Sequence, residues 1–383
     1  MSARRARTFA GTLALLAAFA GLAGAQEAEP ALAWSVPVGP DAGFKFGFST
    51  ALALHADGTA LLAIDQERGE GDAAVRRPLL LAVAGDGRIL GRSAPHAESH
   101  QYTRGFKLAA DRDGFALFTN RGPPEELVVY RLARDGRVRA AQPVRVRGER
   151  MQEVAGIAAD GRGSVLVFGG GFEGPHSPAL ALLDRNSRVA WSFVGRHPMP
   201  PGGVYAVRFR RGGASDAVVL DREKPFWERR SSGGALLMRA ALPFGGGCWR
   251  FLDERRLAHF FYNWEEQPGI KAPVKRWVLA LHGENGRILP GHVALDLPAE
   301  QHHCRLAVHE SGWIAAAVEV PRIALFDFAL ARRAEIDAAA HGARATDAIA
   351  VDGAGAVTAL VETGSAERPG RTLVLLRFAP PAR

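Results

Sequence analysis

Seven short hairpin signals recur along the chain, and they constrain the fold more than any other feature. Each combines an apolar run, a tight polar turn and a second apolar run, as in "KLAADRDGFALF" at 107–118 and "IAVDGAGAVTAL" at 349–360. The first members of the turn pairs, roughly 40 to 57 residues apart, fall near Asp57, Asp113, Gly161, Gly212, Glu254, Ser311 and Gly353. Asp-Gly pairs readily adopt the positive φ angles that two-residue hairpin turns require. The pattern therefore predicts an all-β chain of repeated hairpins.

A second hairpin follows the first in most units, for example "LVVYRLARDGRVRA" from Leu127 and "WVLALHGENGRIL" from Trp277. Each unit then holds four short strands, and a period near about 45 residues is typical of a propeller blade. A single blade cannot bury its own faces, whereas radial stacking buries them against neighbours. We predict a single β-propeller of seven four-stranded blades over residues 26–383, with six or eight blades as alternatives. A pair of β-sandwiches would explain neither the period nor the strand missing from the last unit.

The last unit supplies only three strands before the chain ends. Its final strand lies in "TLVLLRFAPPAR" from Thr372, whereas the stretch "ALAWSVPVG" from Ala31 resembles the fourth strand "RVAWSFVG" from Arg188. The N-terminal strand is therefore predicted to complete the last blade. Closure of this kind removes two exposed sheet edges.

The first 25 residues have the features of a cleaved signal peptide. Arg4, Arg5 and Arg7 precede an apolar run that ends in Ala23-Gly24-Ala25, a small-x-small cleavage pattern. The rest of the chain has no apolar run long enough to span a bilayer. We expect a periplasmic or secreted protein without a membrane span after cleavage. The net charge of +8 falls to +5 without those three Arg (8 − 3), and no module of interleaved aromatic and basic residues predicts a nucleic-acid partner.

Two segments of unit three carry a family resemblance. The phrase "LALLDRNSRVAWSFVG" at 180–195 resembles the strand pair of bacterial quinoprotein-like (PQQ-like) propeller repeats, in which a tight turn precedes a Trp-bearing strand. "ADGRGSVLVFGGG" at 159–171 resembles the companion hairpin of that superfamily, and Trp34 repeats the Trp of unit three. The resemblance implies a propeller fold. Five of the seven units lack the Trp, so we predict no quinone and no other cofactor.

The long connections of the predicted propeller share one face, which we call the loop-rich face, and the tight turns share the other. Loops that carry variable polar residues are the usual place for binding. The predicted ligand-binding residues, on this face or at the channel mouth, are His100, Tyr102, Arg104, His197, Trp264, His302, His303 and Asp347. No metal site is predicted, because only one of the seven equivalent innermost positions holds a carboxylate, Asp347. A hard metal ion needs several oxygen ligands.

We therefore predict an exported, non-catalytic propeller that binds a protein partner or a small-molecule ligand through the loop-rich face, and we expect a monomer. The alternative is a propeller enzyme, either a quinone-dependent oxidoreductase or a hydrolase. Its site would lie at the channel mouth, near His302, His303 and Asp347.

The only two cysteines, Cys248 and Cys304, begin equivalent innermost strands of adjacent units. Strands that converge on a central channel can bring two Cα atoms within the roughly 4.4 to 6.8 Å that a disulfide requires. An oxidising compartment favours the bond. We predict a disulfide, with two buried thiols as the alternative.

Overall fold

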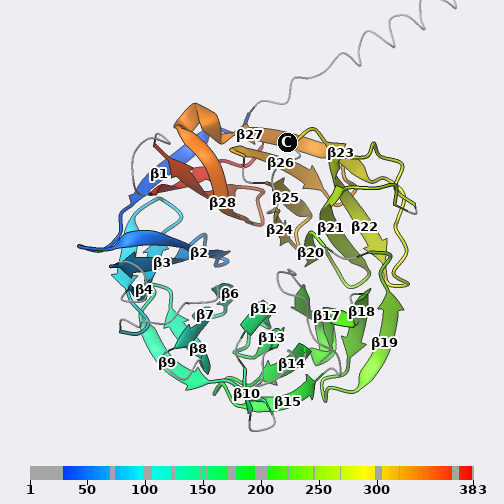
Figure 1. Cartoon of the computed structure of the whole chain (residues 1–383), viewed down its shortest axis with the longest axis horizontal. Helices are drawn as coiled ribbons and strands as arrows, with labels where there is room; N and C mark the ends of the chain where they lie inside the picture. The colour runs from blue at the N-terminus through cyan, green and yellow to red at the C-terminus, as the bar shows by residue number, and fades with distance from the viewer. Residues whose placement is uncertain are drawn as a thin grey trace, which may run out of the picture.

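A computed structural model describes residues 29–69, 74–97, 106–121, 126–146, 149–151, 153–170, 178–194, 206–221, 224–244, 246–267, 269–297, 304–318, 320–364 and 371–381. Seven four-stranded antiparallel sheets are arranged radially around a central opening (Figure 1). The chain is a seven-bladed β-propeller. The predicted fold class and blade number are both confirmed.

Each blade runs from its innermost to its outermost strand in chain order, except the last. Blades one to three are formed by β2 (Lys45–Leu54), β3 (Ala60–Arg68), β4 (Val75–Val83), β5 (Ile89–Ser93); β6 (Lys107–Asp111), β7 (Gly114–Arg121), β8 (Glu126–Ala133), β9 (Val138–Pro143); and β12 (Glu153–Ala159), β13 (Val165–Gly170), β14 (Pro178–Leu183), β15 (Val189–Val194). A separate two-stranded ribbon is formed by β10 (Arg145–Val146) and β11 (Glu149–Arg150).

Blades four to six are formed by β16 (Val207–Phe209), β17 (Ser215–Asp221), β18 (Lys224–Arg230), β19 (Leu236–Ala241); β20 (Cys248–Phe251), β21 (Arg256–Asn263), β22 (Arg276–Gly283), β23 (Val293–Leu295); and β24 (Arg305–His309), β25 (Trp313–Ala317), β26 (Arg322–Asp327), β27 (Arg332–Asp337). Blade seven consists of β28 (Ala343–Val351), β29 (Val357–Thr363), β30 (Thr372–Phe378) and β1 (Leu32–Val38). The two 3-10 helices are η2 (Arg211–Gly213) and η3 (Ala338–His341).

The hydrophobic core lies between neighbouring blades, so it is divided among the interfaces of the ring. Each of the seven blade–blade interfaces contains its own buried apolar cluster. The two middle strands of a blade are buried on both faces, which explains runs such as "ALLAI" in β3 and "LLLAV" in β4. The outermost strand β9 is exposed along its whole length. Burial on both faces produces continuous apolar runs in place of alternation.

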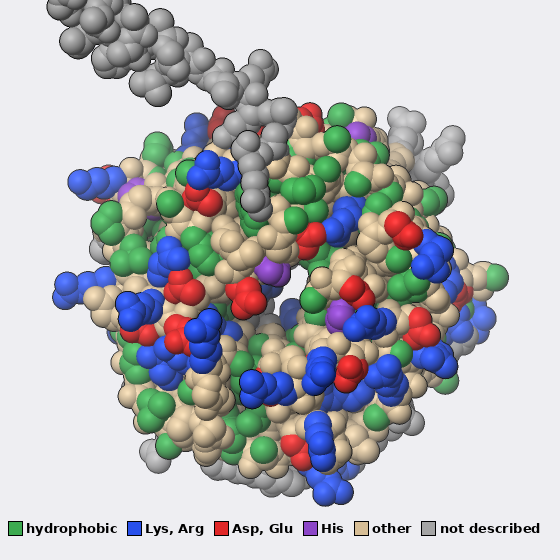
Figure 2. Space-filling view, turned by 180° about the vertical axis from the view of Figure 1, so that it is seen from behind, with side chains coloured by type: hydrophobic (Ala, Val, Ile, Leu, Met, Phe, Trp, Pro, Cys, Tyr) green, Lys and Arg blue, Asp and Glu red, His purple; other side chains and the backbone are tan. Residues whose placement is uncertain are grey.

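The innermost strands form a closed ring around the channel. Contacts join them in the order β2, β6, β12, β16, β20, β24, β28 and back to β2. Every innermost strand leads directly into a tight turn, as predicted, and these turns lie together at one end of the channel, on the face shown in Figure 2. We call this the tight-turn face.

The N-terminal strand closes the ring as predicted. β1 pairs antiparallel with β30, with Val36 opposite Leu375 and Val38 opposite Leu373. Trp34 extends to blade one, where its indole N–H donates to the Gly85 carbonyl at 2.8 Å. In the same way, Trp191 of blade three covers a turn glycine of blade four. The two Trp residues that carry the sequence resemblance therefore both dock on the turn of the following blade.

Two turn glycines in blade five allow the packing of blades to be tested. Gly286 and Gly291 both have positive φ angles, 78° and 98°. An alanine at either position would therefore add about 1 kcal/mol of backbone strain. A Cβ atom at Gly286 would lie 2.0 Å from the Ala241 carbonyl oxygen of blade four, whereas one at Gly291 would meet nothing within 4 Å. We expect Gly286→Ala to lower the free energy of unfolding by about 3 kcal/mol or more, because a blade must shift. Equal losses for both variants in urea unfolding would contradict this.

Candidate functional site

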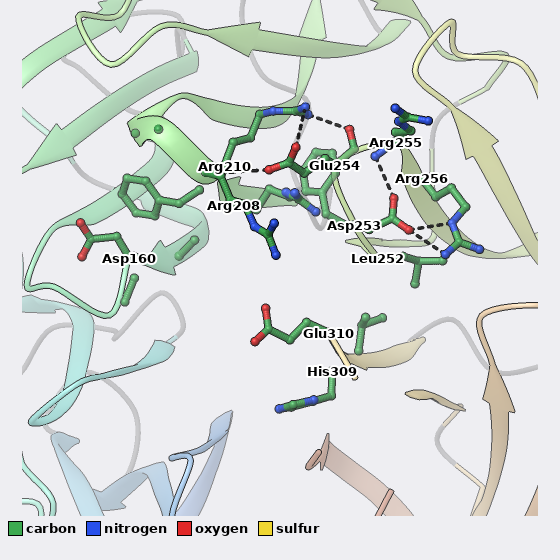
Figure 3. Close-up of a pocket in the computed structure, with 18 of the residues that line it drawn as sticks. Asp160, Arg208, Arg210, Leu252, Asp253, Glu254, Arg255, Arg256, His309 and Glu310 are labelled. Carbon is green, nitrogen blue, oxygen red and sulfur yellow. Dashed lines mark hydrogen bonds and ion pairs between the residues drawn. The ribbon is translucent and has the colours of Figure 1, made fainter. Parts of the chain in front are cut away.

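A large cavity of the described structure opens on the tight-turn face, over blades three to six. It has a volume of about 1830 Å³ and is lined mainly by the turns that follow β12, β16, β20 and β24. Figure 3 shows these turns around the cavity, and Figure 2 shows basic and acidic side chains around the central opening on this face. The cavity therefore lies opposite to the loop-rich face on which binding was predicted.

Three turn tips of the cavity each present an arginine to solvent: Arg162, Arg211 and Arg255 are exposed. The turns are held by side chains that accept backbone N–H groups, which leaves the tip residue outside. The Asp160 carboxylate accepts from the N–H of Arg162 at 2.7 Å, and Asp253 accepts from that of Arg255 at 2.8 Å. Asx turns of this kind are typical of Asp at the first position. Among the described residues, none of the three guanidinium groups has a carboxylate partner.

A buried ion network supports the wall between blades four and five. Asp216 on β17 is fully buried and accepts from Arg210 and from Arg229, both at 2.9 Å. Arg229 also donates to Glu284 at 2.6 Å, and Arg210 donates to the Glu254 carbonyl at 2.7 Å. A buried carboxylate needs such partners to remain charged. The network fixes the position of Arg210, of Arg229 on β18 and of the turn that carries Glu254.

The Glu254 carboxyl is held ionised at this position. Its pKa is lowered, first because the Arg211 backbone N–H donates to it and then because of the positive charges of Arg210 and Arg208. Glu254 therefore neutralises part of the arginine charge and fixes the η2 turn.

Three side chains extend into the open space of the cavity: Arg208, His309 and Glu310 (Figure 3). Arg208 lies 3.7 Å from Asp216, and burial lowers its pKa. His309 Nδ1 accepts from the Ser311 backbone N–H at 3.2 Å, and the Ser311 hydroxyl donates to the Gly353 carbonyl at 2.8 Å. Ser311 is therefore a turn residue whose proton is already committed to a carbonyl.

The electrostatic balance of the cavity is positive. Of its four lining carboxylates, Asp160 accepts turn N–H groups, Asp253 pairs with Arg256, and Glu254 pairs with Arg210. Among the described residues, only the Glu310 carboxylate has no such partner. The three arginine tips, whose guanidinium groups have no carboxylate partner, therefore outnumber it. Guanidinium groups bind carboxylates and phosphates through paired N–H donors. Among the described residues, no group of three His, Cys, Asp or Glu side chains could hold a metal ion.

Most of the predicted ligand-binding residues lie outside the described part of the chain. These are His100, Tyr102, Arg104, His197, His302 and His303. Their assignment stays a prediction, and the signal peptide at residues 1–25 also falls outside the described residues.

The two described members, Trp264 and Asp347, belong to different blades. Trp264 follows β21 of blade five, is 58% exposed, and packs edge-to-face on Tyr262 at 4.5 Å. Asp347 on β28 of blade seven accepts from Arg371. Neither lines the cavity of the tight-turn face.

The predicted disulfide is present. Cys248 and Cys304 are bonded with a Cα–Cα distance of 5.9 Å, and the bond joins the start of β20 to the residue that precedes β24. Blades five and six are thereby linked at the innermost strands.

The sequence interpretation missed the arginine-bearing turns of the cavity. Two runs carried a signal: "VRFRRGG" at 207–213 and "DERR" at 253–256, both unusually basic for hairpin turns. The first lies in unit four, where the turn lacks Asp-Gly and the repeat was difficult to align. Both runs were interpreted only as connections between strands.

The comparisons with known proteins identify a fold and no family. No protein-family model matches the sequence, and no curated protein matches it either. The WD40 domain of Pan2 from Neurospora crassa is 12% identical over 93% of this chain and 97% of that chain, with a TM-score of 0.55. The Dos1 propeller is 8% identical over 86% and 93%, with a TM-score of 0.51. BamB from Moraxella catarrhalis is 12% identical over 91% and 100%, with a TM-score of 0.45. At such identities the likeness shows the propeller fold alone.

The described structure has no helix long and apolar enough to cross a membrane.

Proposed function

We propose that this protein is a non-catalytic binding protein that receives an acidic segment of a partner protein in the cavity of the tight-turn face. The observation that carries the proposal is the set of three arginine tips, Arg162, Arg211 and Arg255, around a cavity of about 1830 Å³. Small-molecule sites usually measure about 300–1,000 Å³ and are mostly apolar. A larger, charged depression suits a polypeptide segment whose carboxylates pair with the arginines.

We also propose that the protein is exported and that its loop-rich face makes a second contact with a partner. The Cys248–Cys304 disulfide supports export, because disulfides persist in oxidising compartments. On the loop-rich face, the exposed Trp264 supports a second contact with a partner, since exposed aromatic side chains are frequent at interfaces. The alternative of an enzyme at the channel mouth has less support, because the Asp347 carboxylate is already bonded to Arg371.

A fluorescent Glu-rich peptide provides the test. We expect the protein to bind it at low ionic strength, with an affinity that falls as salt screens the charges. The double variant Arg162→Glu/Arg255→Glu should bind at least about tenfold more weakly, because it removes two guanidinium partners and adds two repelling carboxylates. Both side chains are exposed, so the melting temperature should hardly change.

Arg88→Glu is the matched control, because Arg88 is exposed in the β4–β5 turn of the same face and does not line the cavity. It should bind the peptide nearly as well as the unmodified protein. The proposal is wrong if the peptide does not bind, or if Arg88→Glu weakens binding as much as the double variant does.

A further inference from the structure

A second group of cations is carried by the innermost strands that surround the channel, outside the cavity of the tight-turn face. Lys107 is the first residue of β6, Arg250 the third of β20, and Arg305 the first of β24. Arg250 is two residues, and Lys107 and Arg305 are five residues, from the tight turn that follows the strand, roughly 7 to 17 Å along it. None of the three lines the tight-turn cavity.

The order of the ring places these three residues opposite one another. From β6, three steps in one direction lead to β20 and three steps in the other lead to β24. Figure 1 shows β6 across the central opening from both strands. The strands that carry Lys107, Arg250 and Arg305 therefore face one another across the channel.

The charges interact at this position. The pKa of Lys107 is lowered to about 8, first by burial and then by the positive charges of Arg250 and Arg305. Burial also lowers the pKa of Arg250. Like charges that approach in a half-buried site destabilise the folded state.

The hydrogen bonds of the two arginines to backbone carbonyls hold both guanidinium groups in place. Arg250 donates to the Trp249 carbonyl at 2.8 Å, and Arg305 donates to the Cys304 carbonyl at 3.2 Å and to the Asp347 carbonyl. Neither Lys107 nor Arg250 has a carboxylate partner in the described structure. The three donors of the Lys107 ammonium likewise have no acceptor there.

The disulfide keeps two of the three cations together. Cys248 lies two residues before Arg250, and Cys304 directly precedes Arg305. The strands of the two arginines are therefore joined by a covalent link between blades, and repulsion cannot separate them. A preorganised cation cluster of this kind binds an anion without a further cost of assembly.

We infer that the channel binds a small multivalent oxyanion, of the phosphate or carboxylate class, between Lys107, Arg250 and Arg305. An anion with two or three charges would pair with the Lys107 ammonium and the Arg250 guanidinium together, next to Arg305. This site goes beyond the proposed function, because it uses other residues and a ligand of another size.

Thermal unfolding of the purified protein tests the inference, with inorganic phosphate and citrate as separate probes against sodium chloride of equal ionic strength. Phosphate and citrate are expected to raise the melting temperature, and calorimetric titration should give one bound anion per chain. Lys107→Met should melt no lower than the unmodified protein in chloride, because it removes the repulsion. Its gain with either anion should be largely lost, with affinity at least tenfold weaker.

Three controls separate this site from general salt effects and from the tight-turn cavity. Lys224→Met removes an exposed lysine on β18 and should keep the full increase in melting temperature with phosphate and citrate. This variant controls for the general stabilisation that both anions give to proteins. Lys107→Arg should keep most of the gain. The double variant Arg162→Glu/Arg255→Glu should keep the increase in melting temperature, although it no longer binds the acidic peptide. An unmodified protein that responds to neither anion, or a Lys107→Met variant with an undiminished gain, would overturn the inference.

Discussion

A chain that begins at residue 39 is expected to lose most of its stability, whereas a chain that begins at residue 29 should fold normally. The difference between them contains β1, which supplies the fourth strand of blade seven. Without it, the outer edge of β30 is exposed, and exposed edges pair with other chains. The interface between blades seven and one also loses Val36 and Val38, which are 7% and 4% exposed.

The two valines alone contribute about 3 to 6 kcal/mol of apolar burial. An ordinary domain has a total stability of about 5 to 15 kcal/mol, so this loss is a large part of it. Urea unfolding and size-exclusion chromatography of the two chains would measure the effect. A finer pair of variants is Val36→Asp, which buries a charge, and Ser35→Asp, which places one on the exposed face of the same strand. Closure by β1 is refuted if the chain from residue 39 stays monomeric with an unchanged melting temperature.

Removal of the disulfide is expected to cost about 4 kcal/mol of unfolding free energy. Cys248 and Cys304 are separated by 56 residues, and a cross-link over a loop of that length restricts the unfolded chain by about this amount. The double variant Cys248→Ala/Cys304→Ala should therefore unfold at lower urea concentration, with the loss appearing mainly as a shift of the midpoint.

A reducing agent offers the matched comparison for the disulfide. It should lower the stability of the unmodified protein towards that of the double variant and leave the variant itself unchanged. Equal midpoints of the two proteins under oxidising conditions would show that the bond contributes nothing. The same variant also tests the channel site, since the strands of Arg250 and Arg305 would no longer be linked, and anion binding should weaken without disappearing.

Much of the fold could be predicted from the sequence, because the signals are local. A tight turn such as that at Asp135 and Gly136 requires positive φ, and Gly136 adopts 82°. The length of the repeat defines a blade, and a last unit with three strands needs a fourth from elsewhere. Even the cysteine pair was predictable, because Cys248 and Cys304 occupy the same phase of adjacent repeats. Each inference needed only the strand order of the repeat and the phase of a segment within it.

The two charged sites depend on the ring as a whole. Arg162, Arg211 and Arg255 lie in three successive blades, and each appears in the sequence only as the tip of a separate turn. Lys107 meets Arg250 and Arg305 because seven blades place β6 opposite β20 and β24. With six or eight blades, other strands would lie opposite.

The sequence by itself thus determined the strands and the turns, because backbone conformation and apolar burial depend on adjacent residues, and it determined the closure and the disulfide, because the repeat shows which strand is missing and which positions are equivalent. Only the tertiary structure decided which charges converge. The physical reason is that electrostatic interactions act through space, across a channel whose geometry is set by the number of blades and by their packing.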